Sequence, residues 1–131
     1  MKARSAVIID DEPDVTSYLS TLLSDHGWET HAANDVQQGL ALVREARPDV
    51  VLLDLMMPER GGLSMLVAIR KDPMLHDTPV VIVSGIQEKL NADYHAYLER
   101  FRHYRADAFV DKPVDAAELL RTIDGLVHAT A

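Results

Sequence analysis

The sequence contains no cysteine, no long apolar run and no excess of positive charge. Without cysteine, disulfides, thiol chemistry and cysteine-ligated zinc are excluded. No apolar run approaches the roughly 20 residues that a membrane-spanning helix needs, and the four apolar residues Ala6–Ile9 are too few for a signal peptide. The net charge of −8 argues against nucleic acid as the main partner, because phosphate binding favours a basic surface. We therefore expect a cytoplasmic protein with no membrane segment and no direct nucleic-acid binding.

What the chain does contain is typical of one globular domain. Its 131 residues are 47% hydrophobic and 26% charged, an ordinary globular composition. This length is enough for a domain with a substantial hydrophobic core. We find no internal repeat, low-complexity segment or linker.

Short apolar runs alternate with segments in which apolar residues recur at helical spacing. The runs are Ala6–Ile9, Val50–Leu53, Val80–Val83 and Ala108–Val110, and Glu29–Ala33 is a weaker candidate. Continuous apolar runs of this length are typical of strands buried on both faces. The helical segments begin near Asp14, Asn34 or Asp35, Gly61 and Asp115, and another covers residues 87–105. Such alternation predicts an α/β fold, a parallel sheet with helices on both faces.

The predicted topology brings distant polar residues together. Right-handed crossovers place the carboxyl ends of all parallel strands at one edge of the sheet. Polar residues follow four of the predicted strands directly or closely. They are Asp10, Asp11, Asp54, Ser84 and Lys112.

The acidic residues at this edge have two interpretations. Asp10-Asp11-Glu12 is either a solvated turn leading into a helix, where acids are favoured, or a divalent cation site. Asp54 is either solvated at the edge or held by a cation, because burying an unpaired charge is costly.

Convergence of the five polar groups favours the cation site. Three carboxylates suit a hard cation such as magnesium. The hydroxyl of Ser84 and the ammonium of Lys112 could then help to hold a phosphoryl group from several sides. Asp54 would be the nucleophile, since a carboxylate can form an aspartyl-phosphate.

Several short motifs occur in a fixed order after successive strands. They are Asp10-Asp11, then Asp54 with Met57-Pro58 and Gly61-Gly62 after it, then Ser84-Gly85, and finally Lys112-Pro113. In this order they resemble the receiver domains of two-component response regulators, and the chain is similar to the chemotaxis-regulator-like members. The resemblance covers about residues 5–127. It implies a single receiver domain over residues 1–131, with a flavodoxin-like, doubly wound fold and strand order 2-1-3-4-5.

The resemblance also implies roles for the acidic residues. Asp54 resembles the phosphoacceptor, which takes a phosphoryl group from a histidine kinase or a histidine phosphotransfer protein. Asp11, Asp54 and the backbone carbonyl of Met56 resemble the ligands of Mg²⁺ (or Mn²⁺). Asp10 resembles the acid that reaches the ion through water.

Residues after the last two strands resemble the switch machinery. Lys112 matches the lysine that pairs with the acids and the phosphoryl oxygens, and a cis peptide bond to Pro113 is implied. Ser84-Gly85 and Phe109 match phosphoryl-binding and switch positions. Phosphorylation adds about two negative charges, which would draw Ser84 inward and let Phe109 turn. The surface of the fourth helix, fifth strand and fifth helix would change, so the module is a switch rather than a turnover enzyme.

Other functions are compatible with the same alternating pattern. A flavodoxin-type cofactor binder needs a phosphate loop after the first strand, where the acids of this chain would repel an FMN phosphate. A magnesium-dependent phosphohydrolase usually needs a cap or further substrate loops, for which 131 residues leave little room. A module that only binds partners would need neither the acceptor nor the lysine.

One segment, residues 87–105, departs from the family pattern. The number of residues between Ser84 and Lys112 exceeds that in typical receivers by about a turn and a half of helix. Most of the aromatic residues lie in this segment: Tyr94, Tyr97, Phe101 and Tyr104. It is either a longer amphipathic helix with an aromatic core stripe or an interface for a partner or a homodimer. The sequence does not identify the downstream target.

Overall fold

The computed structural model describes residues 3–55, 57, 61–85 and 106–130. Within them, parallel strands form one sheet of order β2-β1-β3-β4-β5. The strands are β1 (Ser5–Ile9), β2 (Glu29–Ala33), β3 (Val50–Leu53), β4 (Val80–Ser84) and β5 (Ala108–Asp111). The predicted parallel sheet and its strand order are confirmed.

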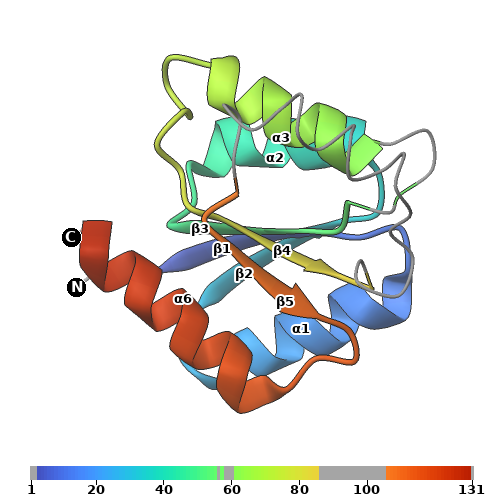
Figure 1. Ribbon diagram of the computed structural model, residues 1–131, viewed down its shortest axis with the longest axis vertical. Helices are drawn as coiled ribbons and strands as arrows, with labels where there is room; N and C mark the ends of the chain where they lie inside the picture. Colours follow the sequence, from blue (N-terminus) through green and yellow to red (C-terminus); the bar gives the residue numbers. More distant parts are fainter. Residues whose placement is uncertain (1–2, 56, 58–60, 86–105, 131) are drawn as a thin grey trace.

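Helices cover both faces of this sheet (Figure 1). They are α1 (Pro13–Asp25), α2 (Val36–Ala46), α3 (Gly61–Lys71) and α6 (Ala116–Thr130). Figure 1 shows α2 and α3 together on one face, and α1 and α6 on the other. The long helix predicted within residues 87–105 lies outside the described residues.

The central strand explains why the sequence pattern was clear. Every residue of β3 is buried, and successive side chains alternate between the two faces of the sheet. Val51 and Leu53 pack into the cluster that includes residues of α2 and α3. Val50 and Leu52 pack into the cluster on the α1 and α6 face. A strand with two apolar faces must be apolar throughout, which produces the continuous run.

Local signals place the helix ends. The carboxylate of Asp35 accepts a hydrogen bond from the amide of Gln38 at 2.7 Å, so Asp35 rather than Asn34 caps α2. Asp115 accepts from the amide of Glu118 at 3.0 Å, in the manner predicted for the start of α6. Gly27 follows α1 with φ of +87°, a conformation that glycine adopts without strain.

Candidate functional site

Pairing of β1 with β3 brings Asp10 and Asp54 together. Ile9 lies opposite Leu53 in the register of these strands, and each aspartate follows its strand directly. The amide of Asp54 donates to the carbonyl of Ile9 at 3.0 Å. Two carboxylates from distant parts of the chain are thus held at the carboxyl edge by the sheet itself.

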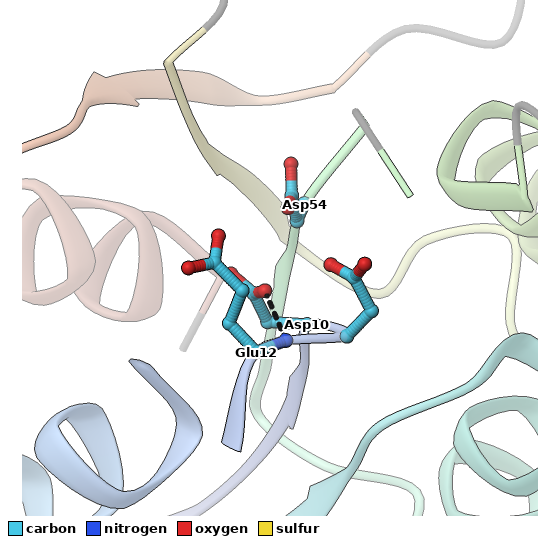
Figure 2. A group of neighbouring side chains, drawn as sticks. Asp10, Glu12 and Asp54 are labelled. Carbon is cyan, nitrogen blue, oxygen red and sulfur yellow. Dashed lines mark hydrogen bonds between the residues drawn. The ribbon is translucent and has the colours of Figure 1, made fainter. Parts of the chain in front are cut away.

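Four carboxylates gather at this edge. Oxygens of Asp10, Asp11, Glu12 and Asp54 lie within 4.8 Å of one another. Asp10 and Asp54 are buried, with 2% and 4% exposure, whereas Asp11 and Glu12 are exposed. Figure 2 shows Asp10 and Glu12 on one turn with Asp54 above them, and the amide of Glu12 donating to Asp10 Oδ1 at 2.9 Å. We call this group the acid cluster.

Lys112 supplies the positive charge that faces the acid cluster. Its Nζ lies 2.7 Å from Asp10 Oδ2, 3.4 Å from Asp54 Oδ2 and 3.5 Å from Glu12 Oε1. Lys112 directly follows β5, so the side chain reaches across β4 and β3 along the same edge. Its peptide bond to Pro113 is cis, the isomer that the resemblance implies.

Burial and charge change the proton affinities of this pair. Burial raises the pKa of Asp10 above its usual 3.8 and the charge of Asp54 adds to the rise, while hydrogen bonds from Lys112 and Glu12 oppose it. Burial lowers the pKa of Lys112, but the hydrogen bond to Asp10 and the charges of the carboxylates outweigh it and raise the pKa above 10.5. The pKa of Asp10 is thus raised mainly by its burial, whereas the pKa of Lys112 is raised by the carboxylates around it. Among the described residues, one ammonium faces three of the four carboxylates, so the group keeps an excess of negative charge.

A partly buried polar network, which the sequence did not reveal, holds the turn that carries Asp10-Asp11-Glu12. The amide nitrogen of Asn34 donates to the carbonyl of Asp10 at 2.8 Å and to Oγ1 of Thr16 at 3.3 Å. Thr16 is only 4% exposed, and its hydroxyl donates to the carbonyl of Pro13 at 3.0 Å. These bonds connect the end of β1 to α1 and to the turn after β2.

Two further residues at the site were not assigned a role from the sequence. Glu12 belongs to the acid cluster and faces Lys112. The run of three successive acids was the sequence feature that could have indicated this position. Gly62 begins the first turn of α3, where a Cβ would overlap the carbonyl oxygen of Asp54 and lie 2.6 Å from Cα of Leu55. A side chain at position 62 would displace the backbone that carries Asp54.

The remaining predicted residues are located by the strand register or lie outside the described part. Ser84 ends β4 opposite Asp111, at the carboxyl edge, and Gly85 follows it half-buried. Phe109 lies opposite Ile82 on the edge strand β5 and is 57% exposed. Met56, with the carbonyl implied as a ligand, lies outside the described residues.

The family is settled by comparison with known proteins. The model of the response regulator receiver domain matches residues 6–124. The chain belongs to this family. It is therefore a receiver domain of two-component response regulators, a signalling switch module.

Curated relatives are about 30% identical to this receiver domain over the aligned residues. It is 31% identical to protein PilH of Pseudomonas aeruginosa over 121 residues, 92% of this chain and 95% of PilH. It is 30% identical over 127 residues to the DNA-binding dual master transcriptional regulator RpaA of Synechocystis, covering 95% of this chain and 49% of RpaA. The receiver domain thus spans about half of one relative and nearly all of another.

A solved structure shares the fold. The receiver domain of the Francisella response regulator 1452 superposes with a TM-score of 0.79 at 26% identity, covering 98% of this chain and 99% of that one.

In the part of the chain that is described, no helix is long and apolar enough to cross a bilayer.

Proposed function

We propose that Asp54 accepts a phosphoryl group from the phosphohistidine of a histidine kinase or a histidine phosphotransfer protein. The observation that carries the proposal is the position of Lys112 Nζ, between Asp10 and Asp54 and within 3.4 Å of both. An ammonium there would bind a phosphoryl oxygen on Asp54 as well as the acid turn. Phosphoryl transfer depends largely on such positioning and charge neutralisation.

The acid cluster has the composition of a site for Mg²⁺ or Mn²⁺. All its side-chain donors are carboxylate oxygens, the ligands that hard cations prefer. Asp11 and Asp54 would bind the ion directly with the carbonyl of Met56, and Asp10 through water. When bound, the ion would neutralise charge on the phosphoryl oxygens.

The residues of this chain then have defined parts in the transfer. An oxygen of Asp54 forms the new O–P bond while the N–P bond of the donor histidine breaks, and the departing imidazole nitrogen takes a proton from solvent. Lys112 holds the transferred oxygens and keeps its proton, because its pKa is raised. The product is a modified protein, so the module is a switch that assists its own phosphorylation and dephosphorylation, and not a turnover enzyme.

The signal would be transmitted through the surface that the resemblance implies, formed by the fourth helix, expected within residues 87–105, together with β5 and the last helix, α6. Ser84 at the carboxyl edge would approach the new phosphoryl group, with the backbone of Gly85 beside it. Phe109, now 57% exposed, would turn into the space that Ser84 leaves. A local charge change becomes a change of surface when packing has two arrangements.

We further propose a single domain over residues 1–131 that acts in the cytoplasm on a downstream target. Direct binding to nucleic acid is not part of this proposal, because the net charge is −8. Neither a cofactor-binding nor a phosphohydrolase function is favoured by an observation. The acid cluster occupies the loop where a flavin phosphate would bind.

Incubation with acetyl phosphate and MgCl₂, followed by intact mass spectrometry, tests the proposal. The wild-type protein should gain the mass of one phosphoryl group, and EDTA should prevent the gain. Asp54→Asn should not be modified. Asp77→Asn, whose side chain is 93% exposed and far from the edge, is the matched control and should behave like wild type. Equal modification of Asp54→Asn would refute the assignment.

A further inference from the structure

A concave surface lies at the opposite edge of the sheet from the acid cluster. Arg4 precedes β1 and Trp28 precedes β2, so both lie at the amino ends of their strands, near the middle of α6. The cavity between them has a volume of about 430 Å³. Small-molecule sites typically have roughly 300–1,000 Å³. The cavity is therefore large enough for a small organic molecule.

Its lining combines an apolar floor with a charged rim. Ile123 is 1% exposed, and Trp28 and Leu120 are half-buried; all three belong to the hydrophobic cluster on the α1 and α6 face. Around this floor lie charged or ionisable side chains. They are Arg4, His26, Arg121 and Asp124. An aromatic surface beside cationic groups suits a ligand that is itself both flat and anionic.

The charge of this cavity is opposite to that of the molecule. The chain has a net charge of −8, yet the cavity gathers two arginines and a histidine against one carboxylate. That carboxylate, Asp124, lies 3.7 Å from Arg4, with side-chain exposures of 63% and 41%. An exposed pair of this kind is weak. A ligand carboxylate or phosphate can therefore replace Asp124 beside Arg4.

We propose that this cavity binds a small aromatic anion. The ring of the ligand lies against Trp28, and its phosphate or carboxylate group pairs with Arg4 and Arg121. Guanidinium groups suit both anions because their planar donors form paired hydrogen bonds. The site is independent of the proposed phosphorylation, since it lies at the amino edge of the sheet and uses none of the acid cluster.

The sole tryptophan of the chain provides the readout. In ¹H–¹⁵N NMR spectra its indole N–H is a single resonance. We would titrate the protein with AMP and with 2-naphthoate, an aromatic phosphate and an aromatic carboxylate. Adenosine lacks the charge and ribose 5-phosphate lacks the ring, so they are the matched ligand controls. At least one aromatic anion should shift the Trp28 resonance saturably, and neither control should.

Variants separate the proposed contacts from general charge effects. Arg121→Glu should weaken binding about ten- to hundredfold, the range for a lost charged hydrogen bond. Asp124→Asn, which removes the competing carboxylate, should strengthen it. Arg44→Glu makes the same charge change on α2 and should leave affinity unchanged, because the ion pair with Asp72 that it breaks lies on the other face of the sheet from the cavity.

Three results would overturn the inference. They are the absence of a saturable shift with both probes, equal binding of adenosine or ribose 5-phosphate, and unchanged affinity in Arg121→Glu. Phosphorylation of Arg121→Glu by acetyl phosphate should match wild type, so failure here leaves the role of Asp54 untouched.

Discussion

At the scale of single residues, the acid cluster is held together against its own repulsion. Asp10 is buried beside Asp54 and is stabilised by the ammonium of Lys112, which it shares with Asp54 and Glu12. Removing the partner of a buried charge lowers stability, because the charge is left unpaired. Removing the buried charge itself can raise stability. The site therefore stores unfavourable electrostatic energy that a bound dication would relieve.

Asp10→Asn should stabilise the metal-free protein at neutral pH, by about 1 kcal/mol, the usual size of a single-residue effect. Because the pKa of Asp10 is raised in the folded state, its ionisation costs stability as pH rises above 3.8. The advantage of the variant should therefore be small near pH 4 and grow towards neutral pH. Urea denaturation in EDTA at several pH values measures the difference in unfolding free energy between the variant and the wild type.

The same substitution should weaken Mg²⁺ binding, because a carboxylate near the ion is lost. Asp77→Asn, at an exposed position, should change neither quantity. A metal-free Asp10→Asn protein that is less stable than wild type at pH 7 would contradict this account of the acid cluster.

At the scale of elements, close approach of α3 to the end of β3 positions Asp54. Gly62 allows this approach, because any Cβ there would collide with the backbone of Asp54 and Leu55. Backbone atoms cannot move aside as the end of a flexible side chain can. The position of Asp54, the proposed phosphoacceptor, thus depends on a residue in the next helix.

Gly62→Ala should destabilise the protein by roughly 1–3 kcal/mol, the range of overpacked positions, and slow modification by acetyl phosphate. Gly125→Ala is the matched control in α6, where nothing lies within 4 Å of the added Cβ. That variant should gain roughly 0.5–1 kcal/mol, because alanine favours helix. Thermal denaturation compares the two; equal stabilities would show that the contact at position 62 does not constrain the loop.

The sequence predicted most elements because their patterns are local. The apolar runs of β1, β3 and β4 follow from burial on both faces, whereas edge strand β2 is half-exposed and gave a weak pattern. Convergence of Asp10, Asp54 and Lys112 followed from the topology of parallel sheets. Roles of individual side chains within that edge came from the resemblance.

Long-range polar contacts could not be predicted in this way. Asn34 was one of two candidates for the cap of α2, and its amide instead bonds to the carbonyl of Asp10. Arg70 donates to the carbonyl of Thr78 at 2.7 Å and to Asp107 at 2.9 Å, tying the loop before β4 to β5. The spacing of apolar residues along the sequence cannot predict such contacts, because each contact depends on how distant segments pack.

At the scale of the whole molecule, the two edges of the sheet differ in charge. The carboxyl edge carries the acid cluster, and the amino edge carries the cavity rimmed by Arg4 and Arg121. With a net charge of −8, a bound dication at the carboxyl edge reduces both local and overall repulsion. We therefore expect this edge to bind a dication and a phosphoryl group together.

Beryllofluoride mimics a phosphoryl group on a carboxylate. A ¹H–¹⁵N NMR titration with beryllofluoride and Mg²⁺ tests whether the carboxyl edge binds the dication and the phosphoryl group together. Amides of Asp10, Asp54 and Lys112 should shift saturably only when beryllofluoride and Mg²⁺ are both present, and Asp54→Asn should abolish the joint response. Shifts that are the same without Mg²⁺, or that persist in Asp54→Asn, would contradict the account.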